Sequence, residues 1–549
     1  MLAADSPHGI AAPQPRSDSG DLGARVYNIR DFGAKGDGAT LDTAALQAAI
    51  DACSRDGGGT VLVPAGTFVI GATELKSNVT LHIAAAGTLL GSADGKQYHA
   101  IDAIPLQGDH TLGDGNWALL FAVKAANLII EGPGTIDGQG AQFHSAVRGT
   151  PPPSGLGGNR RPYHVLVYQC QDLTVRNLSL VNSAYHSLRV IQCQRVRMDS
   201  IYIHNRVNGN NDGFHFISAE YVTVSNCIVK SQDDACAMFG SCKNIAITNS
   251  YFSTRWSVFR FGGGRAENIA VSNCVLREVY GCPIKLHADV GSRFENMSFS
   301  DLVLDNVTGP INFSVGPSRP VDTTSAAAPL HAEPGLEAAW PVVRNISFSN
   351  IHGNVTTGPA PLSETNYPIG RNYNPGERYS CIALNCIGQS TLENISFDDI
   401  HLAFGGGGTA EQGARRDVPE IAGEYFALGP MPAFAFFARN ARGITLRNVR
   451  FDTSSPDLRP AMILDRVEDV AIMGMSVRSN SAAEATLRFT GTRNVLMAAP
   501  RLLGAANTFL QIEGTGNQRI VVDGGDIASA ATLVAFKDGA SPDAVSVRQ

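Results

Sequence analysis

The sequence predicts an all-β protein: a right-handed parallel β-helix, in which short strands coil repeatedly around one long core. Three observations favour this fold. The pattern Asn/Asp-apolar-x-apolar recurs along the chain, its copies follow a regular spacing, and 57 glycines with 28 prolines in 549 residues mark many turns. Because successive side chains of a strand point to opposite faces, the alternation within each copy predicts a strand with one buried face.

Each copy of the pattern predicts one coil. In the middle of the chain 23 to 28 residues separate successive copies, and five larger gaps of 45 or 49 residues predict a weak coil or a long loop in between. Repeats of this kind are typical of solenoids, in which residues one repeat apart lie stacked on neighbouring coils. The copies begin at Asn78, Asn127, Asp172, Arg195, Tyr221, Asn244, Asn268, Asn296, Asn345, Asn394, Gly443, Asp469, Asn494 and Arg519.

Four asparagines in the coils also match the N-glycosylation pattern Asn-x-Ser: Asn177, Asn296, Asn345 and Asn394. Their places in the repeat favour a structural role instead. We expect them to share one turn position on successive coils and to hydrogen-bond along the stack.

The N-terminal end of the solenoid is expected to carry a capping helix. Apolar residues recur at helical spacing over residues 39–56, and glycines at 57–59 end the pattern. Such a helix covers the first coil, which otherwise exposes an unpaired strand edge. Residues 1–24 are expected to be disordered or processed, and residues 25–549 to form a single β-helix catalytic domain.

Long segments rich in proline and glycine interrupt the coils and exceed the length of a turn. On a rigid solenoid, loops of this kind are expected to wall a binding cleft. They cover residues 141–163, 316–341, 355–380 and 404–432.

Charge and hydropathy exclude several classes of protein. The formal net charge is −7 without a basic cluster, so no nucleic-acid partner is expected. No run of 18 apolar residues occurs, so no membrane span is expected. The N-terminus lacks the regions of a signal peptide, so either the protein is not exported or its signal peptide has been removed. The ten cysteines lack metal-binding spacing, which predicts mostly buried thiols and no metal or cofactor.

Three carboxylates form the most informative cluster. Asp212 and Asp233 are 21 residues apart, close to one repeat, and Asp234 follows directly. The repeat therefore places all three on neighbouring coils. Crowded carboxylates are costly unless they carry out acid/base chemistry or bind a cation, so an active site is the favoured interpretation. A solvated turn rich in aspartate and a Ca²⁺ site are the alternatives.

The spacing of coils suits hydrolysis of a glycosidic bond. In inverting enzymes the two carboxyl groups stand roughly 6.5–9.5 Å apart, which leaves room for the attacking water. Coils lie about 4.8 Å apart, so carboxylates on neighbouring coils reach this separation through their side chains. Their mutual repulsion also separates their pKa values, which keeps one group protonated near neutral pH.

Several segments match a known family. Asn210-Asn-Asp212 and Asp233-Asp234 have the sequence and spacing of its two acidic motifs. Further matches are Tyr27-Asn-Ile-Arg-Asp-Phe-Gly, Gly134-Thr-Ile-Asp-Gly-Gln-Gly and Asn182-Ser-Ala-Tyr-His. Together they resemble glycoside hydrolase family 28, the pectin-active polygalacturonases, over most of residues 25–480.

The resemblance implies an inverting hydrolase that cleaves α-glycosidic bonds. Asp233 would be the general acid, and Asp212 and Asp234 would hold and activate the water. The implied partner is a pectic or related acidic polysaccharide or oligosaccharide, and the implied protein is a secreted or periplasmic monomer without a cofactor.

Two motifs depart from the family. Where its Gly-His-Gly motif is expected, this chain has Arg255-Trp256-Ser257, and its Arg-Ile-Lys motif is Pro283-Ile284-Lys285. The family's Arg/Lys pair resembles a clamp for a uronate carboxylate, and proline does not replace a bidentate arginine. Arg255, Arg260 or His287 is a candidate for the missing charge, and the plain polygalacturonan substrate is in question.

Six residues are expected to contact the substrate: Asn210, Lys285, Trp256, His186, Arg260 and His215. Several have a structural alternative. Trp256 is either a platform under a sugar ring or a core aromatic. For His186, substrate contact and a structural role are equally favoured. Alternation places His215 at an outward or cleft-facing position, where a structural role is slightly favoured over substrate contact.

Three functions remain open. Segments at 419–426 and 428–439 resemble a bacterial branch of the family, whose long loops would close one end of the cleft and favour exo attack. A β-helix lyase or epimerase would need basic groups to neutralise a uronate, and no basic cluster replaces the clamp. A non-catalytic glycan-binding solenoid would explain the altered motifs, but all three costly carboxylates are retained.

Overall fold

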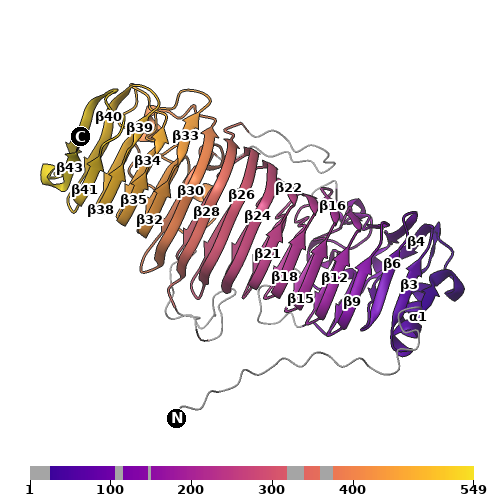
Figure 1. Cartoon of the computed structure of the whole chain (residues 1–549). Helices are drawn as coiled ribbons and strands as arrows, with labels where there is room; N and C mark the ends of the chain where they lie inside the picture. The colour runs from indigo at the N-terminus through magenta and orange to yellow at the C-terminus, as the bar shows by residue number, and fades with distance from the viewer. Residues whose placement is uncertain are drawn as a thin grey trace, which may run out of the picture.

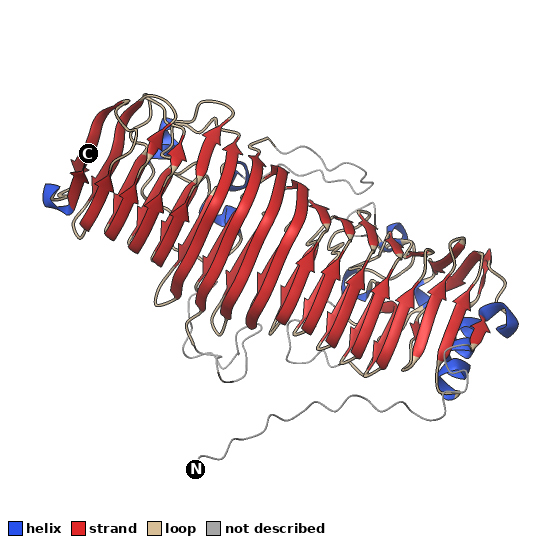
Figure 2. Ribbon diagram, in the orientation of Figure 1, coloured by secondary structure: helices blue, strands red, loops and turns tan. Residues whose placement is uncertain are grey.

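The computed structural model describes residues 25–104, 115–145, 150–317, 335, 339–358 and 375–548. These residues form an elongated right-handed parallel β-helix, with the N-terminal helix α1 at one end and the C-terminal strands at the other (Figure 1). The described strands pair in parallel and form one 28-stranded and one 15-stranded sheet. The predicted fold class is confirmed, and Figure 2 shows how little helix accompanies the strands.

The 15-stranded sheet carries the functional side chains. It consists of β5 (Thr73–Glu74), β8 (Ala118–Val123), β11 (Tyr163–Tyr168), β14 (Leu188–Ile191), β17 (Phe214–Ile217), β20 (Cys236–Phe239), β23 (Phe259–Gly262), β25 (Ile284–Ala288), β27 (Ile311–Val315), β29 (Ile382–Cys386), β31 (Phe436–Arg439), β34 (Met462–Asp465), β37 (Leu487–Thr490), β40 (Ala506–Glu513) and β42 (Ala530–Lys537).

The 28-stranded sheet forms the rest of each coil. Around the site it includes β12 (Gln171–Arg176), β13 (Ser179–Val181), β15 (Gln194–Asp199), β16 (Tyr202–Asn205), β18 (Glu220–Ser225), β19 (Ile228–Ser231), β21 (Lys243–Thr248), β22 (Tyr251–Thr254), β24 (Arg265–Val279), β26 (Arg293–Val307), β28 (Val342–Val355) and β30 (Thr391–Phe404).

One coil shows how the sequence pattern becomes structure. It runs through β14, β15 and β16, which pair with β17, β18 and β19 of the next coil. In β15, Val196 and Met198 point into the core while Arg197 between them stays exposed. In β14 all four residues are buried, because outward-facing Arg189 lies in the site described below and Ile191 packs in a second hydrophobic cluster.

The first residue of the sequence pattern has one backbone conformation throughout. All fourteen such residues, from Asn78 to Arg519, have positive φ between 51° and 68°. This left-handed region is unfavourable for most L-residues and is tolerated best by glycine and asparagine. The repeat read from the sequence is therefore the repeat of a left-handed turn in each coil.

The asparagines at this turn hydrogen-bond to one another. Asn394 donates to Asn345 at 3.2 Å, Asn345 to Asn296 at 3.2 Å, and Asn296 to Asn268 at 3.4 Å. The predicted ladder is confirmed for these residues. It is wrong for Asn177, which has φ 54° but lies after β12, at a second left-handed turn position.

The larger gaps in the repeat separate coils that are direct neighbours. Met297 of β26 pairs directly with Ile346 of β28, so the 49 residues between the two copies hold no extra coil. The other four large gaps likewise separate strands that pair directly: β28 with β30, β30 with β32 (Arg442–Arg447), β6 (Val79–Ile83) with β9 (Ala126–Glu131), and β9 with β12.

Helix α1 (Thr43–Arg55) covers the N-terminal end, as expected. It buries Leu46, Ile50 and Cys53 against the first coils. It begins later than residue 39 because Asp37–Leu41 forms β2 and pairs with β4 (Gly66–Ile70). The expectation for residues 1–24 lies outside the described residues.

One hydrophobic cluster extends from Ile29 to Ile527 and includes stacked rings one coil apart. Phe348 lies 5.2 Å from Phe299 and 5.0 Å from Phe397 between ring centroids. All ten cysteines are buried and free, which confirms the prediction of mostly buried thiols. Across the described ranges, no helix is both long enough and apolar enough to cross a membrane.

The asparagine ladder yields a stability prediction. Asn345→Ala places alanine at φ 57° and removes two ladder hydrogen bonds, so the free energy of unfolding should fall by about 1–2 kcal/mol. Asn345→Gly loses the same bonds without the backbone strain, so its free energy of unfolding should fall by less. Thermal denaturation of both variants checks this, and an alanine variant as stable as the glycine variant would contradict it.

Candidate active site

The site lies at the turn that precedes the 15-stranded sheet. Phe214 and Cys236 pair across β17 and β20, so Asp212 and Asp234, each two residues earlier, occupy equivalent positions on neighbouring coils. The Gly213 amide donates to the Asp234 carbonyl at 2.9 Å and fixes this register. Asp233 directly precedes Asp234, so the structure brings all three predicted acids together.

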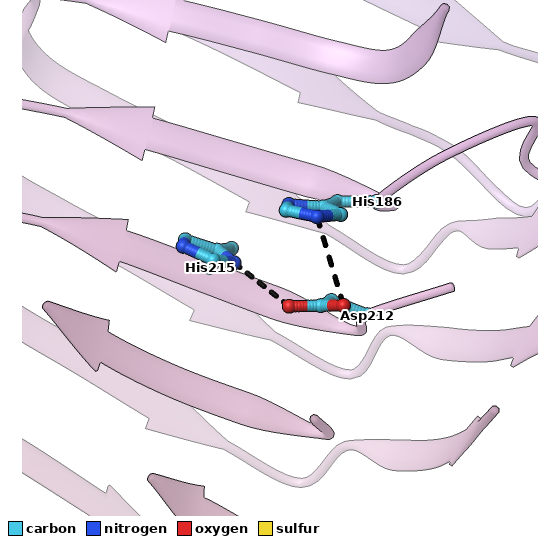
Figure 3. A group of neighbouring side chains, drawn as sticks. All are labelled: His186, Asp212 and His215. Carbon is cyan, nitrogen blue, oxygen red and sulfur yellow. Dashed lines mark hydrogen bonds and ion pairs between the residues drawn. The ribbon is translucent and has the colours of Figure 1, made fainter. Parts of the chain in front are cut away.

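Asp212 is held by two histidines, as Figure 3 shows. Nδ1 of His215 lies 2.8 Å from Oδ2 of Asp212, and Nε2 of His186 lies 3.6 Å from Oδ1. The three side chains are buried, and the imidazole rings stack with centroids 4.4 Å apart. Both predicted contact histidines therefore face Asp212 directly.

The proton on His186 can be placed from its neighbours. Nη1 of Arg189 lies 3.2 Å from Nδ1 of His186, and a guanidinium only donates, so Nδ1 accepts. In the neutral ring the proton then lies on Nε2, toward Asp212. Burial, reinforced by the nearby His215 and Arg189, lowers the pKa of His186 well below its usual value, so the ring is neutral.

His186, Asp212 and His215 also form the one potential metal-binding group among the described residues, with ligand atoms within 4.8 Å of one another. The hydrogen bond between His215 and Asp212 and the contact of His186 with Asp212 argue against a metal here. The Nε2 proton of His186 points toward Asp212, and each carboxylate oxygen already faces one imidazole nitrogen. In the described part of the chain the three aspartates do not converge as a ligand group, which argues against the calcium alternative.

Asp234 is buried, and Asp233 beside it is partly buried. The Asp234 amide donates to Oδ1 of Asp233 at 2.9 Å, and Nδ2 of Asn210 lies 3.4 Å from Oδ2. Burial and the neighbouring Asp234 raise the pKa of Asp233 to about 7. Burial also raises the pKa of Asp234, although Lys285 and Arg260 oppose the shift. The pair therefore holds one proton up to near neutral pH.

Outward side chains of the sheet continue the site away from the acids. Strand register aligns Arg189, His215, Ala237, Arg260, Lys285 and Asn312 in one column across β14, β17, β20, β23, β25 and β27. His215 thus has the outward orientation that alternation predicts. Three of the six expected contact residues belong to this column.

Lys285 and Trp256 meet a loop that no repeat could place. Nζ of Lys285 forms an ion pair with Glu424 and lies 5.2 Å from the centroid of the Trp256 ring. Trp256 is partly buried, and the Phe426 ring lies 6.0 Å from its ring in an edge-to-face contact. The segment 405–435 therefore packs against this part of the sheet through Glu424 and Phe426.

The candidates for the missing positive charge have partners of their own. Arg255 forms an ion pair with Glu377 at 3.4 Å. Arg260 donates to the Phe261 carbonyl at 2.6 Å and lies 3.4 Å from Nδ1 of His287. Burial and Arg260 lower the pKa of His287 to about 4, so His287 is neutral at the pH of most assays.

Sequence reasoning missed Glu424, Glu377, Arg189 and Arg161. Arg161 donates to Oδ1 of Asn210 at 3.1 Å, and its guanidinium lies 4.0 Å from the Tyr185 ring centroid. Arg189 was detectable, because it stands in the same column as His215. Arg161 and Glu424 lie on loops and Glu377 in the short helix α2 (Pro375–Arg378), and the repeat does not determine the course of these segments.

The crowding of acids predicts a stabilising mutation. The pKa of Asp233 is about 7 in the folded state against about 4 when unfolded, so ionisation costs stability as pH rises through this window. Asp233→Asn removes that cost. The free energy of unfolding at pH 8 should rise by on the order of 2 kcal/mol, and the gain should vanish near pH 4. Thermal melts at both pH values check this, and an Asp233→Asn variant less stable than the native protein at pH 8 would contradict it.

Comparison with known proteins identifies the family. The model described as Glycosyl hydrolases family 28 matches residues 53–332. A probable polygalacturonase of Vitis vinifera is 27% identical over 304 residues, 54% of this chain and 58% of that protein. An exopolygalacturonase of Zea mays is 23% identical over 397 residues, 69% of this chain and 84% of that protein.

Two solved structures have the same fold. The exopolygalacturonase of Thermotoga maritima has a TM-score of 0.52 at 20% identity, covering 69% of this chain and 87% of that one. The family 28 exopolygalacturonase of Yersinia enterocolitica has a TM-score of 0.55 at 18% identity, covering 82% and 78%. Because the family match spans just over half of the 549 residues, the chain belongs to glycosyl hydrolases family 28.

Proposed function

We propose that this protein is an inverting glycoside hydrolase that cleaves α-glycosidic bonds of a pectic or related acidic polysaccharide or oligosaccharide. One observation carries the proposal: three carboxylates stand at one turn of neighbouring coils, and burial raises the pKa of one of them to about 7. That group is protonated where the others can act as bases, which is the pairing of acid and base that hydrolysis of a glycosidic bond uses. Inversion is the outcome that the family resemblance implies.

Each acid has a role that its surroundings favour. Asp233 donates its proton to the glycosidic oxygen as the bond breaks. Asp212 and Asp234 orient a water on the opposite face of the sugar and accept its proton. Because His215 and His186 direct protons to Asp212, its carboxylate stays fixed in one orientation.

An exo mode of attack is part of the proposal. A hollow of about 450 Å³ lies beside Asn210, and its lining includes Phe143, His144 and Arg161 of the loop that follows β10 (Thr135–Asp137). A hollow bounded on one side by this loop suits the end of a chain better than its middle. The relative from Zea mays is itself named an exopolygalacturonase. Since a polymer substrate lies outside the cell, we also propose a secreted or periplasmic location.

The role of Asp233 predicts both loss of activity and a pH profile. Asp233→Asn should lower kcat by at least about a thousandfold on whichever pectic substrate the native protein cleaves, while Asp172→Asn, on the opposite sheet, should retain activity. For the native protein, kcat/KM should fall as pH rises above about 7, because Asp233 loses its proton there. Reducing-end assays across a pectic panel check this.

Two results would contradict the proposal. An Asp233→Asn variant that keeps most of its rate would remove the acid from the mechanism. Unsaturated products that absorb in the ultraviolet would indicate a lyase instead.

The histidine contacts predict a positioning role. His215→Ala removes the donor at 2.8 Å from Asp212, so kcat should fall by about tenfold to a hundredfold with KM nearly unchanged. A chelator should leave the native rate unchanged, because the histidines serve as hydrogen-bond donors. Steady-state kinetics test both points, and loss of activity on chelation with recovery on adding a metal would contradict this role.

A further inference from the structure

A carboxylate of the protein itself occupies the cationic part of the cleft. Glu424 lies on the loop before β31 and forms its ion pair with Lys285, whose side chain is only 1% exposed. Burial alone would raise the pKa of Glu424, but Lys285 and Arg260 outweigh burial and hold it below its usual value. Glu424 is therefore ionised and faces the same column that carries the site.

Glu424 is fixed from both sides by its chain neighbours. The Gly423 amide donates to Oγ of Ser314 at 3.1 Å, and that hydroxyl donates to the Gly423 carbonyl at 2.9 Å. The Tyr425 hydroxyl donates to the Tyr280 carbonyl at 3.0 Å, and the Tyr425 ring is buried. The position of the Glu424 carboxylate is thus set before any ligand binds.

Arg255 and His287 are also compensated, while Arg260 shares the charge of Glu424 with Lys285. Glu377, itself buried, pairs with Arg255, and His287 is neutral. An anionic sugar placed here would meet the negative charge of Glu424 beside that of the aspartates. Like charges at short range in a partly desolvated site repel strongly, so this part of the cleft disfavours a second carboxylate.

A neutral hydrogen-bonding group continues the column. Asn312 follows Lys285 in register and is 3% exposed. Within the described residues its Oδ1 atom has no hydrogen-bond partner. A buried amide oxygen of this kind suits a hydroxyl donor and offers nothing to a carboxylate.

We propose that Glu424 determines specificity: it excludes a free uronate from the part of the cleft over β23, β25 and β27 and selects an uncharged sugar unit there. A neutral sugar or an esterified uronate has the required chemistry. The inference rests on the proposed function only in assuming that the cleft binds pectic chains.

A matched pair of ligands tests the inference without turnover. Short oligogalacturonides, as free acids and as full methyl esters, share the same sugar and linkage and differ in charge. Calorimetry with Asp233→Asn should show the esters binding about tenfold more tightly than the acids. Adding Glu424→Gln, which keeps a hydrogen bond to Lys285, should reduce the ratio to about twofold or less.

Control variants isolate the charge of Glu424. Glu420→Gln removes a negative charge from the same loop, where Glu420 pairs with the exposed Arg466, and should leave the ratio unchanged. Glu424→Ala should reduce the ratio as Glu424→Gln does, and circular dichroism verifies that each variant is folded.

Each outcome decides the matter. Equal affinities, tighter binding of the acids, no binding of either ligand, or an unchanged ratio in Glu424→Gln would overturn the inference. Charge discrimination by a protein that hydrolyses no pectic substrate would support this inference and contradict the proposed function. Hydrolysis without charge discrimination would support the proposed function and contradict this inference.

Discussion

The parallel register of the coils is the constraint on which the rest of the structure depends. Main-chain hydrogen bonds hold each coil about 4.8 Å from the next, so equivalent residues line up in columns. One such column places Asp212 beside Asp234, and another aligns His215, Arg260 and Lys285. A shift of one residue between coils would turn these side chains into the core and disperse the site.

The same register lowers the stability of the folded chain at the site. Carboxylates that would avoid one another in solution are held together and partly desolvated, and the raised pKa of Asp233 measures that cost. A long core and the asparagine ladder supply the rigidity that tolerates it. Stability elsewhere in the solenoid thus supports an unfavourable but chemically useful arrangement at one turn.

The repeat explains what the sequence could and could not predict. Strand positions, the capping helix, the stacking of the acids and the outward direction of His215 all follow from a period, and all appear in the structure. Arg189 followed from the same column but was overlooked. Glu424 and Glu377 lie outside the repeating strands, where no period links a residue to its partner, so only the folded chain reveals the pairs with Lys285 and Arg255.

The central claim is that water attacks the sugar opposite the acid, under the control of carboxylates on neighbouring coils. Proton NMR of the first product formed from an α-linked pectic oligosaccharide, recorded before mutarotation, tests it most directly. The arrangement of Asp233 against Asp212 and Asp234 predicts that the β-anomer appears first. Initial release of the α-anomer would contradict the account, because retention requires a covalent intermediate on one carboxylate.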